Sequence, residues 1–208
     1  MRNWLFLAAA LCFCLACPSA FGAVYTLAPP DPDLGDLTHQ KYYTWGINRP
    51  WAPAHDGVYE EAVAVSLAFD RIRNWDNHNN DLYVHLLDFG KLGITIAADN
   101  QGGGDNFAGQ GVLLTHYVNL PPAPQDLVYH FTDEQVGVLN SYAADGRFAL
   151  GFDPDCHFYN CGVELEIVTN SVRVPEPGVV CLLASGSAIV CARRRRRSAR
   201  QGTPLPDA

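Results

Sequence analysis

Residues 61–70 read Glu61-Ala62-Val63-Ala64-Val65-Ser66-Leu67-Ala68-Phe69-Asp70. The large apolar residues in this run recur at every second position, at Val63, Val65, Leu67 and Phe69, and small residues separate them. Successive side chains of an extended strand point to opposite faces of a sheet. The run therefore predicts a β-strand whose large apolar face is turned toward a core.

Similar short segments follow, separated by turns rich in Gly, Pro, Asn and Asp. They predict strands at residues 82–88, 92–98, 112–118, 127–131, 148–152 and 163–169. The polar run at residues 76–81 predicts a hairpin that joins the first strand to the second, from Leu67 to Leu87. Residues 24–53 contain many prolines and aromatic residues, and we expect a lead-in strand and a loop that lies across the domain.

One helix is expected in the second half of the chain. Thr132-Asp133-Glu134-Gln135 is a capping sequence, and the helix should run to about residue 143 and stop at Asp145-Gly146. Many short strands with one short helix predict an all-β fold, an antiparallel two-layer β-sandwich of the jelly-roll type. This domain is expected to occupy residues 23–173.

The N-terminus has the pattern of a targeting segment. Residues 1–22 carry one positive charge, then an apolar core and small residues, as a secretory signal peptide does. We expect cleavage after Gly22. Cleavage after Ala23, a lipoprotein-type cleavage before Cys17 and an uncleaved anchor are the alternatives.

The C-terminus combines a short motif, an apolar run and a basic cluster. The motif is Val174-Pro175-Glu176-Pro177, and residues 179–192 form the apolar run. The cluster that follows consists of Arg193, Arg194, Arg195, Arg196 and Arg197. Residues 198–208 form a polar tail, which we expect on the cytoplasmic side.

This C-terminal arrangement resembles the PEP-CTERM sorting signal of Gram-negative bacteria that export exopolysaccharide. The resemblance rests on the motif, the apolar run and the arginine cluster at residues 174–197 of the 208-residue chain. In that family a membrane-embedded exosortase, regarded as a cysteine-dependent protease-transpeptidase, processes the protein near the motif. The resemblance thus implies that the chain is an exosortase substrate. It also implies that the protein is associated with exopolysaccharide or biofilm. An ordinary single-pass tail anchor is the alternative.

The physical properties of the tail fit a transient anchor. As a helix, residues 178–192 would span about 22 Å, less than the roughly 30 Å of hydrocarbon in a bilayer. The arginine cluster would hold this end on the cytoplasmic side of the inner membrane, leaving the preceding domain outside. We therefore expect export across the inner membrane, transient anchoring by a transmembrane helix, and then the cell surface or the extracellular space.

The predicted domain is strongly acidic. Residues 23–174 contain seven Lys and Arg against 20 Asp and Glu, a net charge of −13. Such a surface repels phosphate backbones, which argues against nucleic acid as a partner. The two cysteines of the domain, Cys156 and Cys161, are an even pair in an exported protein and predict one disulfide.

Oxygen-rich turns suggest where a cation could bind. Asp153 and Asp155 alternate along the chain, and Asp76 and Asp81 bound a polar turn. Calcium takes such oxygen ligands, and turn formation is the other interpretation of each cluster. No other cofactor is indicated.

Three aromatic residues are candidates for stacking against a carbohydrate: Trp75, Trp45 and Tyr159, with core packing as the alternative for each. The chain contains no nucleophile elbow, zinc-protease motif or phosphate-binding loop, and we predict that it is not an enzyme. A carbohydrate- or calcium-binding module is the alternative to a purely sorted surface protein, and an extracellular hydrolase is the third.

Overall fold

The computed structural model describes residues 22–52, 58–78, 80–99 and 103–173. The predicted signal peptide up to residue 21, the sorting motif, the apolar run and the arginine cluster lie outside the described residues. Among the described residues, 22–52 and 60–172 belong to one compact unit, which contains the sandwich.

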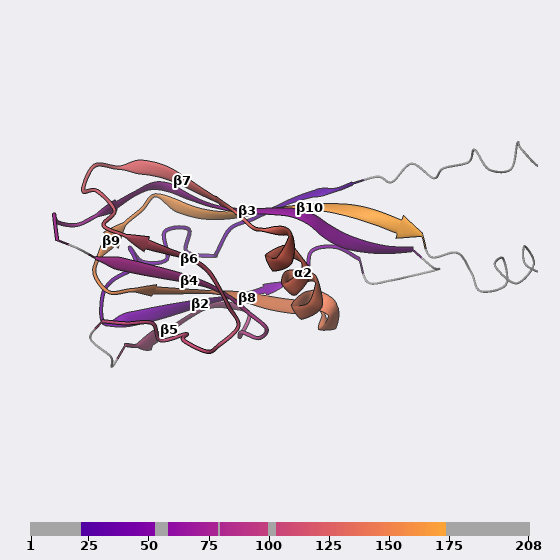
Figure 1. Ribbon diagram of the computed structural model, residues 1–208, viewed down its shortest axis with the longest axis horizontal. Coiled ribbons are helices and arrows are strands. Elements are labelled where there is room, and N and C mark those ends of the chain that lie inside the picture. The colour runs from indigo at the N-terminus through magenta and orange to yellow at the C-terminus, as the bar shows by residue number, and fades with distance from the viewer. Residues whose placement is uncertain (1–21, 53–57, 79, 100–102, 174–208) are drawn as a thin grey trace, which may run out of the picture. The chain divides into compact units, whose positions relative to one another are not determined.

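Over the described residues the fold is all-β with one short α-helix, as the sequence predicts (Figure 1). Its elements are β1 (Val24–Leu27), β2 (Lys41–Asn48), β3 (Val58–Asn74), β4 (Asp81–Leu87), β5 (Gly93–Ala98), β6 (Val112–Val118), β7 (Gln125–His130), α2 (Asp133–Tyr142), the 3-10 helix η1 (Ala143–Asp145), β8 (Arg147–Pro154), β9 (Phe158–Tyr159) and β10 (Gly162–Arg173).

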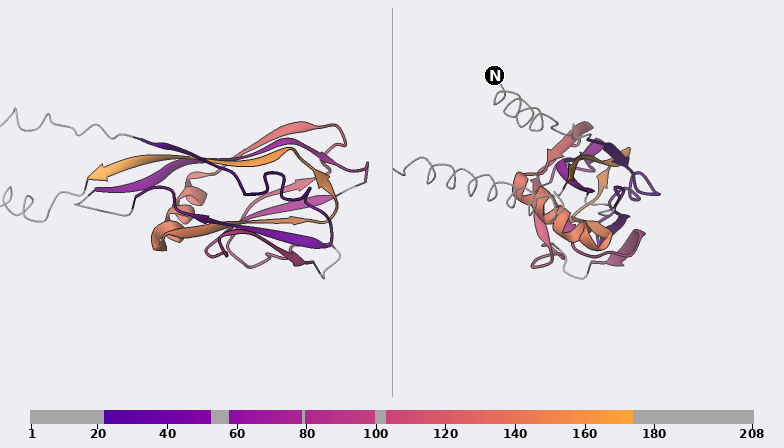
Figure 2. Two further views of the ribbon diagram at one scale, coloured as in Figure 1. Left: turned by 180° about the vertical axis from the view of Figure 1, so that it is seen from behind. Right: turned by 90° about the vertical axis from the view of Figure 1, so that its right-hand side faces the viewer.

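The strands form two mainly antiparallel sheets. One has the order β1-β10-β3-β7, with β9 also paired to β3, and the other has the order β5-β2-β8-β4-β6. Antiparallel pairs join β1 to β10, β2 to β8, β3 to β7 and β4 to β6, so the pairing is nested along the chain. In the end-on view of Figure 2, the strands of the two sheets are arranged around the long axis of the domain.

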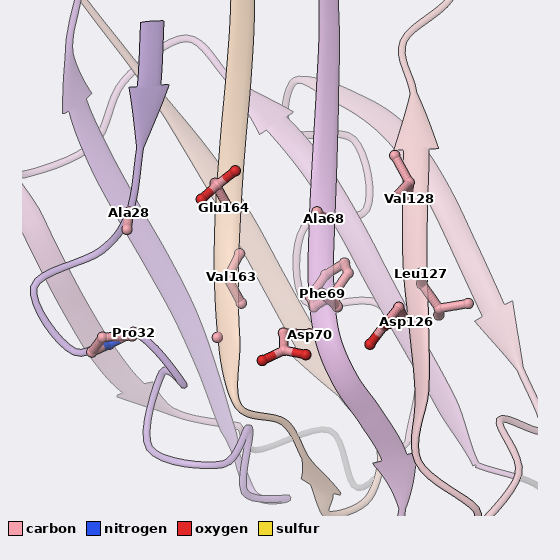
Figure 3. Close-up of a pocket in the computed structure, with 11 residues that line it drawn as sticks. Ala28, Pro32, Ala68, Phe69, Asp70, Asp126, Leu127, Val128, Val163 and Glu164 are labelled. Carbon is pink, nitrogen blue, oxygen red and sulfur yellow. The ribbon is translucent and has the colours of Figure 1, made fainter.

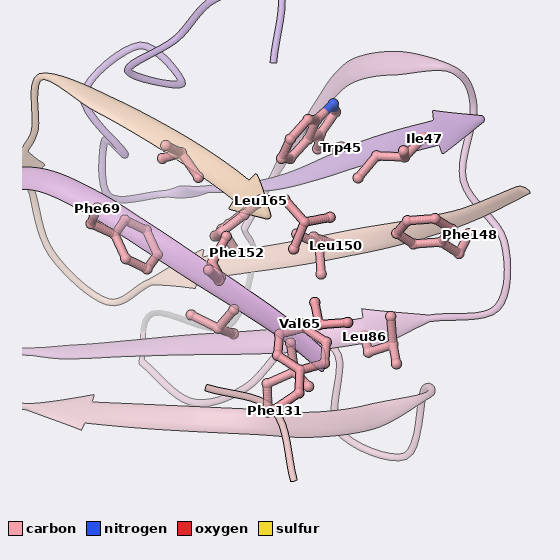
Figure 4. Close-up of a cluster of buried hydrophobic side chains, with 14 of the residues drawn as sticks. Trp45, Ile47, Val65, Phe69, Leu86, Phe131, Phe148, Leu150, Phe152 and Leu165 are labelled. Atoms are coloured by element: carbon pink, nitrogen blue, oxygen red, sulfur yellow. The ribbon is translucent and has the colours of Figure 1, made fainter. Parts of the chain in front are cut away.

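Side chains from the inner faces of both sheets fill the core, as in other sandwiches. Figure 4 shows Phe69 and Leu165 of one sheet beside Trp45 and Phe152 of the other. Phe69 and Phe152 meet edge to face, with 6.0 Å between ring centres. This geometry is favourable for aromatic pairs.

The strand prediction for residues 61–70 is confirmed, with one correction to its inward face. Val65, Leu67 and Phe69 are buried, whereas Val63 is 51% exposed and Ala62 is buried in its place. Asn140 of α2 accounts for this change, because its amide accepts from Ala62 N–H and donates to Ala62 C=O, both at 2.9 Å. Helix α2 is therefore hydrogen-bonded to β3 at the point where the alternation of buried side chains breaks.

The predicted helix forms with its predicted cap. The Gln135 N–H donates to the Thr132 hydroxyl (3.2 Å), and the Thr132 N–H donates to the Gln135 side chain (2.9 Å). Gly146, at φ 99°, ends the helical segment in the left-handed conformation that favours glycine.

Two predictions about connectivity are wrong. β3 and β4 belong to different sheets, so residues 67–87 do not form a hairpin, and β4 pairs with β6 and β8 instead. Residues 24–53 contain two strands, not a strand and a crossing loop. In the second of these, β2, Tyr43, Trp45 and Ile47 are buried at every second position, which is the sequence signal of a strand.

Candidate functional site

A β-bulge interrupts β3 between Phe69 and Ile72. Phe69 pairs with Leu127 and Ile72 with Gln125, so β3 contains one residue more than β7 over this interval. Arg71 has the left-handed φ of 51°. Its backbone N–H donates to Oδ1 of Asp126 at 3.0 Å, which ties the bulge to β7.

The bulge determines which side chains face outward. Without it, the alternation that buries Phe69 would also direct residues 71 and 73 toward the core. With it, Ile72 and Asn74 are buried, and Arg71 and Arg73 are exposed. Re-aiming a side chain is a known consequence of a bulge. Two arginines thus lie on the outer face of the sheet.

The segment at residues 157–161 runs antiparallel along this part of β3. Tyr159 of β9 pairs with Arg73. The Trp75 N–H donates to the His157 carbonyl at 3.1 Å, and the Cys161 N–H donates to the Asp70 carbonyl at 2.8 Å. We call the surface formed by Arg71, Arg73, Trp75 and Tyr159 the β3–β9 patch.

Ring contacts hold the patch together. The guanidinium carbon of Arg73 lies 4.9 Å from the Tyr159 ring centre, within cation–π range. The His157 and Tyr159 ring centres are 4.6 Å apart. Trp75 is 55% exposed, and its indole N–H donates to Sγ of Cys156 at 3.0 Å.

A pocket of about 240 Å³ opens beside the patch, lined by Asp36, Arg71, Arg73, Pro124, Tyr159, Asn160 and Cys161. Neither guanidinium in it forms a hydrogen bond or an ion pair within the described part of the chain. Asn160 is 6% exposed and donates to the Asp33 carbonyl at 2.8 Å. Its Oδ1 is buried and has no partner among the described residues. The pocket thus contains two cationic side chains that have no acidic partner among the described residues.

A second pocket, of about 380 Å³, has no lining residue in common with the first, but its residues lie next to them along the strands: Asp70 precedes Arg71, and Gly162 follows Cys161. Figure 3 shows three carboxylates around it, Asp70 from β3, Asp126 from β7 and Glu164 from β10. Ala68 and Gly162 also line it and leave room on the face of the sheet. One end of the combined surface is therefore basic and the other acidic.

The predicted calcium ligands Asp153 and Asp155 anchor a loop. The Asn106 N–H donates to Oδ2 of Asp153 at 2.6 Å, and the Gly104 N–H donates to Oδ1 of Asp155 at 3.0 Å. Burial is the main cause that raises the pKa of each carboxyl group, while the loop hydrogen bonds oppose it. Phe107 of the same loop packs on Gly151 and Tyr42.

The other two predicted ligands also have local partners. Oδ1 of Asp76 accepts from the His78 N–H (2.9 Å) and from the Asn80 amide (3.1 Å). These hydrogen bonds, with those from His78 foremost, lower the pKa of Asp76. Oδ1 of Asp81 lies 3.1 Å from Nε2 of His116. Over the described ranges, no three His, Cys, Asp or Glu side chains form a metal-binding group.

The remaining predicted residues divide between core and surface. Trp45 is 4% exposed and packs in the core, so the prediction that it stacks on a ligand is wrong. Trp75 and Tyr159 come together in the β3–β9 patch. Arg71 and Arg73 were not predicted, although two arginines at positions that alternation would bury could have indicated the bulge.

Cys156 and Cys161 are free in the structure and do not form the predicted disulfide. Residues 157–161 pair along β3 through backbone hydrogen bonds. A disulfide would require this segment to fold back until the two Cα atoms were roughly 4.4–6.8 Å apart.

The sequence matches no protein-family model, and no curated protein matches it. Similar solved structures include a latent aurone synthase, a polyphenol oxidase, at 10% identity and TM-score 0.36, over 62% of this chain and 24% of that one. Latent apple tyrosinase is similar at 11% identity and TM-score 0.35, over 70% of this chain and 27% of that one. A tomato aspermy virus structure is similar at 11% identity and TM-score 0.27, over 85% and 97% of the two chains.

The chain spans about a quarter of the length of the two oxidases, and at these TM-scores the likenesses carry no argument about function. No helix among the described residues is long and apolar enough to cross a membrane.

Proposed function

We propose that this chain is an exported surface or extracellular-matrix protein, sorted through a PEP-CTERM signal that an exosortase processes, and associated with exopolysaccharide. The observation that carries the proposal is the order of its parts. A signal-peptide pattern precedes a sandwich domain, and the motif at residues 174–177, an apolar run and five arginines follow it. In this proposal the domain has no catalytic role in its own sorting.

The finer assignment of the sandwich as a jelly roll is part of the same proposal. Its support is the nested pairing of β1 with β10, β2 with β8, β3 with β7 and β4 with β6, alternating between the two sheets. This pairing supports a jelly roll, in which eight antiparallel strands form two sheets. β5 and β9 are additions to this plan.

The sorting proposal is tested by expressing the full chain with and without an exosortase and recovering it from the cell surface and medium. Mass spectrometry of its C-terminal peptide should find an end near residues 174–178 only when the enzyme is present. Replacing Pro175, Glu176 and Pro177 by alanine should abolish this processing. A recovered chain that is intact through Ala208 in the presence of the enzyme contradicts the proposal.

Carbohydrate binding is a second candidate function, and the β3–β9 patch favours it. An exposed tryptophan, a tyrosine and two arginines gather beside a pocket on one face of the sheet, and neither arginine has an acidic partner among the described residues. Aromatic rings supply stacking surfaces, and the charged groups nearby supply hydrogen bonds. Calcium binding has no comparable support, because the four candidate aspartates have partners within the protein.

A further inference from the structure

We propose that the β3–β9 patch binds a carboxylate-bearing sugar within an acidic polysaccharide. Arg71 and Arg73 contact the carboxylate, and Trp75 packs against a neighbouring sugar ring. This inference rests on the carbohydrate-binding function named above and assigns its ligand class.

The charge of the patch selects an anion. The domain has a net charge of −13 and only seven cationic side chains, yet two of them stand in one pocket without an ion pair to any described residue. A guanidinium presents a planar fork of donors that matches a carboxylate in two parallel hydrogen bonds. Asp36 is the one acid among the described residues that line this pocket, so this lining keeps a net positive charge.

The aromatic residues of the patch have different roles. Trp75 is more than half exposed, and its N–H bond to Cys156 fixes the indole while leaving ring surface open. Tyr159 already contacts Arg73 and His157, so it acts as a positioning residue that holds the Arg73 guanidinium.

The adjoining acidic pocket restricts the ligand further. Asp70, Asp126 and Glu164 would repel a second carboxylate placed there, but they can accept hydrogen bonds from the hydroxyls of a neutral sugar. The surface therefore fits a polymer in which carboxylated and neutral sugars alternate, and it disfavours a continuous polyuronate.

The test uses the full chain with Arg193 to Arg197 replaced by glutamine, because those arginines would bind any polyanion. Hyaluronan, in which glucuronate alternates with a neutral amino sugar, is the main probe. Its carboxyl-reduced form and polygalacturonate are the comparison polymers. Affinity is measured by biolayer interferometry for this chain and for three variants of it: the double variant Arg71→Gln/Arg73→Gln, Arg73→Lys and Arg147→Gln.

Arg147 provides the matched control. Its guanidinium carbon lies 5.7 Å from the Phe89 ring centre, so its removal deletes the same charge and the same type of contact away from the patch. The expected result is a loss of affinity for hyaluronan of at least about tenfold in the double variant. Arg73→Lys keeps the positive charge but loses the planar set of donors, so its affinity for hyaluronan should lie between those of the parent chain and the double variant. Arg147→Gln should bind within about twofold of the parent chain.

Other outcomes overturn the inference in distinguishable ways. If the double variant and Arg147→Gln bound hyaluronan with equal affinity, Arg71 and Arg73 would not be part of the binding site. If the carboxyl-reduced polymer bound as tightly as hyaluronan, carbohydrate binding would stand and the acidic ligand class would fall. If the parent chain bound none of the three polymers, both the ligand class and the carbohydrate-binding function would fall.

Discussion

The Arg73 guanidinium lies over the ring of Tyr159, with 4.9 Å between Cζ and the ring centre, and the two residues pair directly across β3 and β9. This contact exists because the bulge at Arg71 turns Arg73 outward. The two-residue strand β9 then places a ring beneath it. A local irregularity of one strand and a short added strand thus produce the surface proposed to bind a glycan.

Replacing Tyr159 by leucine should weaken glycan binding about two- to fivefold without removing either arginine. An exposed cation–π contact contributes about 0.5–1 kcal/mol, and its loss frees the Arg73 side chain. Tyr159→Phe keeps the ring and should bind like the parent chain. Interferometry on hyaluronan measures both, and equal binding by the leucine variant would show that Tyr159 does not position Arg73.

The left-handed backbone conformation of Arg71 should lower the free energy of unfolding of the domain. At φ 51°, a side chain with a Cβ is disfavoured relative to glycine. Arg71→Gly and Arg71→Ala both remove the guanidinium, but the glycine variant should have the larger free energy of unfolding, by about 1 kcal/mol. Urea denaturation measures the difference. A less stable glycine variant would contradict the backbone geometry assigned to the bulge.

The sequence predicts the regular parts of this fold because they follow simple rules. Alternation at Val65, Leu67 and Phe69 identifies the core face of β3, and Thr132 with Gln135 identifies the start of α2. The departures arise from contacts between distant residues. The Asn140 side chain accepts a hydrogen bond from the Ala62 N–H, and the Asp126 side chain accepts one from the Arg71 N–H. Each break in alternation therefore depends on a distant partner that the local sequence pattern does not reveal.

The candidate site was predictable only in part for the same reason. Trp75 and Tyr159 are recognisable as aromatic residues beside polar turns, but their proximity depends on the pairing of β9 with β3. Asp153 and Asp155 share a polar pattern with cation ligands, yet the loop that includes Gly104 and Asn106 supplies their partners. Composition shows that such side chains exist, and topology determines whether they meet a ligand or a backbone amide.

Stability should rise as the pH is lowered from neutral toward the ordinary carboxyl range, because of Asp153 and Asp155. Burial, with nearby carboxylates such as Asp99, raises their pKa above 3.8, so the native state binds these protons more tightly than the unfolded state. Asp76 has the opposite effect on stability below pH 3.8. Its pKa is lowered in the native state, so protonation of its carboxylate removes stabilisation.

Replacing Asp153 by asparagine should therefore reduce the gain in unfolding free energy between about pH 7 and pH 4.5. Urea denaturation at a series of pH values measures this, with the exposed Asp88→Asn as the control for loss of one charge. An unchanged pH dependence in the Asp153 variant would contradict the role assigned to its burial.

Removing the Asn140 side chain should destabilise the domain. Asn140→Ala deletes two hydrogen bonds to Ala62, each 2.9 Å long, and leaves a strand N–H and C=O without those partners. The expected loss is about 1–3 kcal/mol of unfolding free energy. Ser141→Ala, at an exposed neighbouring position, is the control and should change stability little. Equal stabilities of the two variants would show that α2 is not held to β3 in this way.

The most direct test of a glycan lying against Arg71 and Arg73 is the alkylation rate of Cys161. This thiol is exposed and lines the same pocket as the two arginines. Peptide mass spectrometry after timed treatment of the full chain with iodoacetamide measures the rate with and without saturating hyaluronan. Bound glycan should slow alkylation of Cys161 in the parent chain and leave it unchanged in Arg71→Gln/Arg73→Gln. An unaltered rate in the parent chain at saturation would place the glycan elsewhere.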